Sequence, residues 1–280
     1  MDDIRAPSGR TTRTPRIGFA FSGGAVRGFA HVGVLEVLYE AGIYPDMTIG
    51  VSAGSIIAAL VAAQIPLQRI GELVRVITWR QLARPAFPSR MGLFTLKPMA
   101  RLLEQETGVH TIEELPLTFA CGAFDVEREE FLVLKEGPLA SAVQASCSVP
   151  GIFTPVKREG RLLVDGGIFN NLPVKALREM GADFVIAVDV MPKGSTPRPP
   201  RHMFDLLSTA FFNMIRANSH ERALADVVIE PQIRWETFWN MKYRERLLEQ
   251  ARQAARAALP TIRQKLRAWA AQPGGEEEHD

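Results

Sequence analysis

The sequence predicts an α/β fold of three layers, in which helices cover both faces of a mostly parallel central sheet. Short apolar runs of strand length alternate with longer helical stretches through most of the chain, which is the pattern that parallel strands and crossover helices produce. Two of these runs end in glycine-rich turns that lead directly into helices. The chain has 280 residues, 46% of them hydrophobic, which is enough for one sizeable core.

Strands and helices follow one another without an internal repeat or a visible domain boundary. Residues 16–272 are therefore predicted to form a single domain, between a flexible segment at 1–15 and a disordered acidic tail at 273–280. Strands are expected near residues 16–21, 47–50, 117–125, 131–134, 161–164, 183–189 and 226–230. Helices are expected near residues 27–41, 55–64, 138–145, 173–180, 204–215 and 243–269, with an interruption at Pro260 in the last.

The second predicted strand ends in Gly50-Val51-Ser52-Ala53-Gly54, which has the Gly-x-Ser-x-Gly pattern of a nucleophile elbow. In such an elbow a sharp strand-to-helix turn exposes a serine hydroxyl. Gly50 and Gly54 leave room where a Cβ atom would not fit. The helix that follows directs free N–H groups towards the same place and stabilises negative charge there. Ser52 is therefore the candidate nucleophile.

The first predicted strand ends in another glycine-rich loop, Ser22-Gly23-Gly24-Ala25-Val26-Arg27-Gly28. Such a loop presents backbone N–H groups to a phosphate or to the oxyanion of an ester. A dinucleotide site would need glycine in place of Ala25, and a Walker A loop would need Gly-Lys-Ser/Thr where the chain has Arg27-Gly28-Phe29. Because a serine elbow follows, an oxyanion hole at Gly23, Gly24 and Ala25 is favoured over a packed turn without a ligand.

A third motif, Asp165-Gly166-Gly167, follows the apolar run Leu162-Leu163-Val164. Alone it indicates a β-turn with a capping aspartate. In this order, however, the three motifs resemble the patatin-like phospholipase family from about Arg16 to Asp189. The resemblance includes the helix at 28–35 and the segment Ala145-Ser146-Cys147-Ser148 with the residues up to Pro155.

The resemblance implies a patatin-like fold of the small stand-alone bacterial type and a phospholipase or lysophospholipase activity. It implies a catalytic dyad in which Ser52 is the nucleophile and Asp165 the general base, without a metal or other cofactor. Gly28, Gly50, Gly54, Gly166 and Gly167 would support the loops, and Arg27 would order the first loop or contact a phosphate head group. Many members carry glycine where this chain has Ala25. Alanine is small enough that the loop is expected to form.

The dyad needs an aspartate of raised basicity. A serine hydroxyl is a poor nucleophile until its proton is accepted, and a water-exposed aspartate with a pKa of ~3.9 is a weak base. Burial of Asp165 in an apolar cleft would raise that pKa. Water activated by the same residue would then release the fatty acid.

Three other functions compete with a lipid-cleaving dyad. A carboxylesterase or thioesterase with an α/β-hydrolase triad needs a histidine after Asp165. His202 and His220 are interpreted as surface residues, His279 lies in the acidic tail, and His31 and His110 precede Asp165. Cys147 is expected near the site, but a cysteine nucleophile there has no histidine in a motif. The last alternative is a non-catalytic lipid-binding or regulatory protein that keeps the fold.

Composition excludes several classes of protein. A formal net charge of +2 gives no basic signature for nucleic acid. Cys121 and Cys147 have no disulfide framework or metal-ligand spacing, and no carboxylate cluster resembles a calcium loop. The start of the chain has no apolar leader, and residues 49–65 are too short for a membrane span. A cytoplasmic location is expected, with contact at the inner membrane face as an alternative.

Several segments bear on the substrate. Residues 79–103 are basic, aromatic and broken by prolines, so a lid, a surface resting on anionic lipid and an ordinary connecting loop all remain open. Apolar residues at helical spacing in 204–215 favour core packing over an acyl-chain groove. The amphipathic stretch 243–269 is expected to pack on the domain, with reversible membrane contact as the alternative. The proline-rich stretch 191–201 is expected to be a surface loop.

Overall fold

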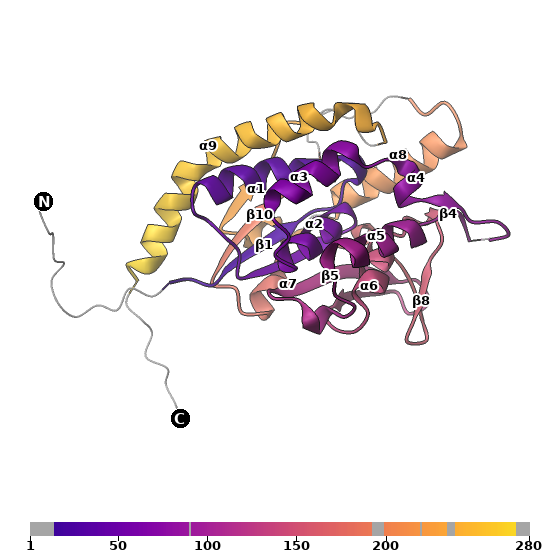
Figure 1. Cartoon of the computed structure of the whole chain (residues 1–280), viewed down its shortest axis with the longest axis horizontal. Coiled ribbons are helices and arrows are strands. Elements are labelled where there is room, and N and C mark those ends of the chain that lie inside the picture. Colours follow the sequence, from indigo (N-terminus) through magenta and orange to yellow (C-terminus); the bar gives the residue numbers. More distant parts are fainter. Residues whose placement is uncertain (1–13, 90, 192–198, 219, 234–238, 273–280) are drawn as a thin grey trace, which may run out of the picture.

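A computed structural model describes residues 14–89, 91–191, 199–218, 220–233 and 239–272. Within these residues the centre is an eight-stranded sheet of order β11-β10-β1-β2-β5-β9-β8, in which β6 also pairs with β5. The five strands from β11 to β5 are parallel, and β6, β9 and β8 are added antiparallel (Figure 1). The predicted α/β fold with a mostly parallel sheet is therefore confirmed.

The strands of this sheet are β1 (Ile17–Phe21), β2 (Met47–Val51), β5 (Thr118–Asp125), β6 (Glu130–Leu134), β8 (Val156–Arg158), β9 (Arg161–Asp165), β10 (Phe184–Val188) and β11 (Val227–Ile229). A smaller sheet contains β3 (Arg84–Pro85), β4 (Gly92–Thr95) and β7 (Gly151–Phe153). The α-helices are α1 (Ala30–Glu40), α2 (Ala53–Ala62), α3 (Leu67–Val76), α4 (Trp79–Leu82), α5 (Lys97–Thr107), α6 (Leu139–Ser146), α7 (Val174–Glu179), α8 (Met203–Ala217) and α9 (Arg244–Ala270). Short 3₁₀ helices are η1 (Ala25–Phe29), η2 (Ile112–Glu114), η3 (Gly166–Ile168), η4 (His220–Leu224) and η6 (Met241–Tyr243).

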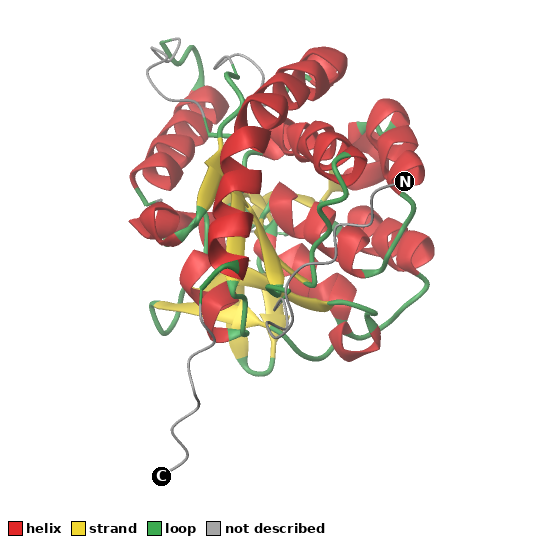
Figure 2. Ribbon diagram, turned by 90° about the vertical axis from the view of Figure 1, so that its left-hand side faces the viewer, coloured by secondary structure: helices red, strands yellow, loops and turns green. Residues whose placement is uncertain are grey.

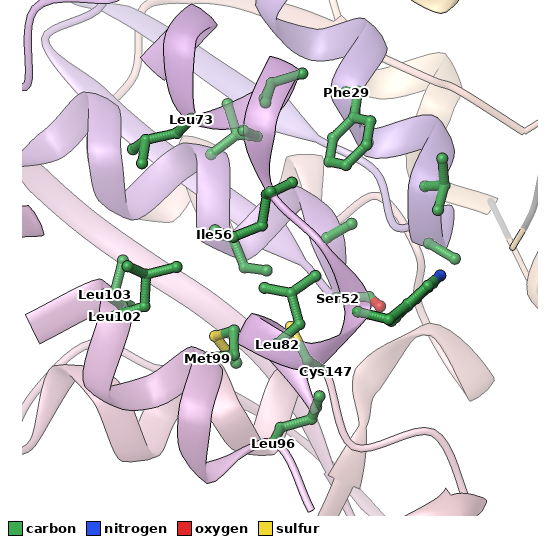
Figure 3. A pocket seen from close by; sticks show the side chains of 18 of the residues that line it. Phe29, Ser52, Ile56, Leu73, Leu82, Leu96, Met99, Leu102, Leu103 and Cys147 are labelled. Carbon is green, nitrogen blue, oxygen red and sulfur yellow. The ribbon is translucent and has the colours of Figure 1, made fainter. Parts of the chain in front are cut away.

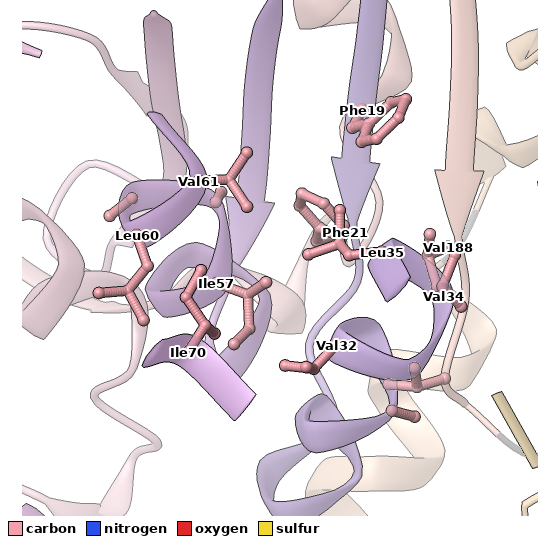
Figure 4. Close-up of a cluster of buried hydrophobic side chains, with 14 of the residues drawn as sticks. Phe19, Phe21, Val32, Val34, Leu35, Ile57, Leu60, Val61, Ile70 and Val188 are labelled. Carbon is pink, nitrogen blue, oxygen red and sulfur yellow. The ribbon is translucent and has the colours of Figure 1, made fainter. Parts of the chain in front are cut away.

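The two faces of the sheet are covered unequally. Phe19 and Phe21 of β1 point into the larger core with residues of α1 and α2 (Figure 4), and α9 lies along α1 on the outside of this layer. Ala20, between the two phenylalanines, belongs to a smaller core on the opposite face, which α7 covers. This alternation follows from the two-residue repeat of a strand, and Figure 2 shows the helices on either side of the strands.

The seven predicted strands are present, and each end lies within one residue of its predicted position. The short strands β3, β4, β7 and β8 were not predicted. The predicted interruption at Pro260 is wrong, because α9 continues through this residue. Pro260 is exposed, so the carbonyl group that loses its helical donor faces water.

The prediction for residues 204–215 is right in part. Phe211, Phe212 and Ile215 are buried in the core, but Leu207 lies on the exposed side of α8. The side chain of Phe204 lies outside the described part of the chain, as do residues 1–13, 192–198 and 273–280, on which the predicted flexible start, proline-rich loop and acidic tail fall. None of the helices in the described residues has the length and apolar character needed to cross a bilayer.

Candidate active site

Two strands of the main sheet meet end to end on one edge of β5. Val51, the last residue of β2, lies opposite Gly122, and Asp165, the last residue of β9, lies opposite Ala123. Since β2 is parallel and β9 antiparallel to β5, their carboxyl ends face each other. Ser52 follows Val51 directly. The strand register therefore brings the predicted nucleophile and the predicted base together.

Ser52 lies in a sharp turn between β2 and α2, with φ 52° and ψ −129°. This conformation is rare for a residue with a side chain and is typical of functional turns. A Cβ atom on Gly50 would collide with the backbone of Gly54, and one on Gly54 would collide with the carbonyl groups of Phe21 and Ser22. The glycine pattern is thus a steric requirement of the elbow.

Two hydroxyl groups hold the elbow in place. The backbone N–H of Ser52 donates a hydrogen bond to Oγ of Ser146 at 2.9 Å, and Oγ of Ser55 donates to the carbonyl of Ser52 at 2.6 Å. Ser146 ends α6 and is fully buried. Its role was not predicted, although it lies in the segment that precedes Asp165 in the family resemblance.

Asp165 is fully buried. Its Oδ1 accepts a hydrogen bond from the N–H of Gly167 at 2.8 Å, and its Oδ2 has no hydrogen-bond partner among the described residues. Burial raises the pKa of Asp165 to about 7, and the neighbouring Ser52 hydroxyl and the Gly167 N–H act in the opposite direction. Ser52 therefore lies near enough to affect this carboxyl group, although no hydrogen bond of ordinary geometry joins them.

The glycine-rich loop lies against Ser52. A Cβ atom on Gly23 would be 3.0 Å from Cβ of Ser52. The N–H of Gly23 donates to Oδ1 of Asn171 at 3.1 Å, and Nδ2 of Asn171 donates back to the carbonyl of Gly23 at 3.4 Å. The N–H groups of Gly24 and Ala25 have no acceptor among the described residues. Of the three amides predicted to form the oxyanion hole, that of Gly23 is therefore already bonded to Asn171 in this structure.

Ala25 has φ 51°, a left-handed conformation. This explains in physical terms why glycine suits this position and why alanine is tolerated only with strain. Gly28 allows the loop to approach α2, because a Cβ atom there would lie 2.6 Å from Cβ of Ala53.

Arg27 and His31 lie inside the protein beneath this loop. Arg27 is fully buried, and its Nη1 lies 4.0 Å from Sδ of Met191. Of its two predicted roles, ordering the loop fits this burial, and contact with a phosphate head group does not. His31 donates from Nε2 to the carbonyl of Ser22 at 2.9 Å, and burial lowers its pKa to about 4.

Among the described residues, the histidines that a triad would need lie away from Ser52, and the cysteines are poorly suited to act as nucleophiles. His110, His202 and His220 are exposed, and no histidine of the described residues lines the pocket beside Ser52. His279 lies outside the described residues. Cys147 does line that pocket, but burial and the nearby Asp165 hold its pKa well above the usual value for a thiol. Cys121 is also buried, which raises its pKa to about 12.

The pocket beside Ser52 is almost entirely apolar. Figure 3 shows Ser52 on one side, Ile56 and Met99 in the middle, and Leu102 and Leu103 on the opposite side. Its walls come mainly from η1, α2, α3, α4 and α5. No described residue of α8, where an acyl groove was the alternative, lines it. Glu106 is the one charged residue among the described residues that line it, and its carboxylate pairs with Arg69 at 2.7 Å.

Comparisons with known proteins agree with this architecture. Residues 19–178 match the sequence profile described as Patatin-like phospholipase. The uncharacterized NTE family protein Rv1063c of Mycobacterium tuberculosis is 31% identical over 221 residues, which are 78% of this chain and 60% of that protein. Lysophospholipase nte1 of Emericella nidulans is 32% identical over 185 residues, 62% of this chain and 12% of that protein.

Among solved structures, VipD from Legionella pneumophila aligns with a TM-score of 0.53 and 13% identity, over 92% of this chain and 72% of that chain. An identity this low shows a shared fold only. The chain spans about three fifths of the mycobacterial relatives it matches. The profile match covers more than half of the chain, and with it the glycine loop, the serine elbow and Asp165. The chain therefore belongs to the patatin-like phospholipase family.

Proposed function

We propose that this protein is a serine acyl hydrolase of lipids, of the phospholipase or lysophospholipase class, with Ser52 and Asp165 as its catalytic dyad. The observation that carries the proposal is the position of the Ser52 hydroxyl, which lies between a buried carboxyl group and a long apolar pocket. Family membership supports lipid hydrolysis in general.

In the first half of the reaction, Oγ of Ser52 attacks the carbonyl carbon of the ester while its proton passes to Oδ2 of Asp165. Oδ2 suits this role because it has no other partner among the described residues. The carbonyl oxygen becomes an oxyanion, which the N–H groups of Gly24 and Ala25 stabilise. A donor of this kind typically contributes ~2.7–4 kcal/mol. Collapse of the intermediate breaks the ester bond, and the proton on Asp165 passes to the departing alcohol.

In the second half, water attacks the acyl-serine and gives a proton to Asp165. The tetrahedral intermediate collapses, the fatty acid leaves, and the proton returns to Oγ of Ser52. One group serves as base and then as acid in each half, which is most efficient when its pKa lies near the working pH. A pKa of about 7 for Asp165 supports this double role.

The pocket supports a substrate with a fatty acyl chain. Apolar side chains of α2, α3 and α5 would replace water around the chain. The relative nte1 is named a lysophospholipase, which favours a phospholipid or lysophospholipid ester for this protein. We place the reaction in the cytoplasm at a membrane surface, with no metal ion in the chemistry.

Release of free fatty acid from phospholipids, lysophospholipids and short p-nitrophenyl esters, with a chelator present, tests the proposal. Ser52→Ala and Asp165→Asn should each lower turnover by at least about 1,000-fold, while His202→Ala and His220→Ala should retain it. Cleavage of short esters alone would contradict the lipid substrate. Loss of turnover in a histidine variant would contradict the dyad. A wild-type protein that a fluorophosphonate probe does not label would be a binding protein.

A further inference from the structure

The hairpin formed by β3 and β4 projects from the end of the molecule on the right of Figure 1. It exposes large apolar side chains to an unusual degree. Phe87 is 96% exposed, Leu93 59% and Met91 53%. Scattered exposed apolar residues are ordinary, but a group of them on one protruding loop marks a contact surface for a protein or a membrane.

The charged residues of the sequence on either side of the hairpin have one sign. From Leu73 to Leu103 the sequence contains six arginine or lysine residues and no aspartate or glutamate. Arg80, Arg84 and Lys97 are exposed and pair with no carboxylate among the described residues. Arg75, farther from the hairpin in sequence, is paired with Glu245 at 3.3 Å. Unpaired cations beside exposed apolar side chains complement an anionic lipid surface, which offers phosphates above an apolar interior.

The hairpin also lies beside the pocket of Ser52, through wall residues that two cavities share. A second groove is lined by Arg80, Pro85 and Phe94 at the hairpin. This groove and the Ser52 pocket share Trp79, Phe153 and Trp239 as wall residues. Three aromatic side chains therefore border both the groove at the hairpin and the pocket of Ser52. A surface for a protein partner would have no need of this connection.

We infer that the hairpin, residues 84–89 and 91–95, is the surface by which the protein docks on an anionic bilayer. Phe87 and Leu93 enter the boundary between head groups and acyl chains, and Arg84 and Lys97 lie at the level of the lipid phosphates. The inference rests on the proposed function for its purpose, because docking delivers the lipid to the Ser52 pocket. Docking itself requires no turnover.

Co-sedimentation of the full chain with vesicles tests the docking, on a Ser52→Ala background so that hydrolysis plays no part. The vesicles contain phosphatidylcholine alone or mixed with phosphatidylglycerol. The pair Arg84→Ser and Lys97→Ser should weaken binding to the mixed vesicles by roughly fivefold for each charge removed, and added salt should weaken binding of the parent protein. The pair Phe87→Ser and Leu93→Ser should weaken binding to both kinds of vesicle.

Matched controls carry the same kinds of change elsewhere. Leu206→Ser with Leu207→Ser removes two leucines of α8 that are 56% and 45% exposed, and Arg263→Ser with Arg267→Ser removes two exposed charges of α9. Both controls should bind vesicles like the parent. Binding that is lost in a control and kept in the hairpin variants would overturn the inference. So would hairpin variants that dissolve a dimer of this chain while vesicle binding is unchanged.

Activity separates this inference from the proposed function. With Ser52 restored, the hairpin variants should lose turnover of vesicle-borne lipid and keep turnover of a soluble short ester, because none of the four changed residues lines the Ser52 pocket. Vesicle binding through the hairpin in a protein with no turnover would refute the proposed function and leave docking intact. Lipid turnover that is equal in the hairpin variants and the wild type would refute docking alone.

Discussion

The backbone N–H of Gly23 and Oδ1 of Asn171 are joined by a hydrogen bond of 3.1 Å. With the return bond from Nδ2 of Asn171, this contact ties the glycine loop to the segment that carries Asp165. Both loops must keep their positions relative to Ser52 for the proposed chemistry. In the proposed mechanism, Asn171 would therefore be a positioning residue whose amide holds the loop that carries Gly24 and Ala25.

Asn171→Ala should lower kcat by up to about 100-fold, because the loop that supplies the oxyanion donors loses its anchor. KM for a soluble ester should change little. The steady-state constants of both variants measure this, with Asn170→Ala as the matched control. Asn170 donates to Glu221 and accepts from the N–H of Leu172, and among the described residues it makes no hydrogen bond to the glycine loop. If Asn171→Ala kept the kcat of the wild type, the glycine-rich loop would not need Asn171 to keep its position.

Activity should fall as the pH drops below about 7. Asp165 must be ionised to accept the proton of Ser52, and burial raises its pKa to about 7. The profile of kcat/KM against pH on a soluble ester reports the essential groups of the free enzyme. A rising limb near pH 7 is expected. A limb near pH 4 would mean that the base is solvated or is another group.

The same burial should make the ionised form of Asp165 lower the free energy of unfolding at high pH. The folded protein retains a proton on Asp165 between pH ~4 and the folded pKa of about 7, whereas the unfolded chain releases it. The free energy of unfolding therefore falls through this window as the pH rises. Asp165→Asn should be more stable than the wild type above pH 7, by up to roughly 4 kcal/mol.

His31 should change the free energy of unfolding in the opposite direction, because its pKa of about 4 in the folded protein lies below its value in the unfolded chain. The stability that neutral, buried His31 contributes is lost as the pH falls from ~6.5 towards 4. Urea unfolding at a series of pH values separates the two residues. The stability of Asp165→Asn should rise with pH between 4 and 6.5, since His31 then acts without opposition. Parallel curves for variant and wild type would contradict the raised pKa.

Ala25→Gly should stabilise the protein by up to about 1 kcal/mol, since glycine adopts the left-handed backbone of this residue without strain. The gain is reduced because glycine is more flexible in the unfolded chain. Denaturant unfolding measures the difference. Ala63→Gly, at an ordinary negative φ after α2, is the control and should destabilise. A loss of stability in Ala25→Gly would argue that the alanine methyl group packs usefully.

Narrowing the pocket at Leu102 should shift the preferred acyl chain. Leu102 lies across the pocket from Ser52 (Figure 3). Leu102→Trp should lower kcat/KM for long-chain p-nitrophenyl esters by at least about tenfold and leave that for the acetate ester unchanged. Leu102→Met keeps the volume and is the control. An equal fall for both esters would indicate damage to the fold, and no change would place the acyl chain elsewhere.

The sequence alone predicts those features of the structure that depend on residues close together in the chain. Gly50 and Gly54 mark the elbow because backbone atoms lie where their Cβ atoms would be. The strands of the parallel sheet are recognisable because they are buried apolar runs. Asp165 was ambiguous by itself, because an Asp-Gly turn has the same pattern, and only its place in the order of motifs suggested a role.

Parts that depend on distant contacts were not predicted. Ser146 meets Ser52 across 94 residues, and Asn171 meets Gly23 across 148 residues. A serine in a helix and an asparagine after a turn carry no local sign of such partners. The short strands β3, β4 and β7 are held by pairing with one another and have too few residues for a period to be visible. The continuation of α9 through Pro260 could not be predicted, because it depends on which side of the helix faces water.

Because β2 and β9 meet end to end along β5, the pairing with this one strand sets how far apart Ser52 and Asp165 lie. Val51 and Asp165 lie opposite Gly122 and Ala123, so the ends of β2 and β9 are offset by one backbone step of ~3.3 Å along β5. Surface loops of this protein could then change in length or sequence without altering the spacing of Ser52 and Asp165. New substrate preferences have room to evolve at the pocket and the hairpin while the chemistry stays constant.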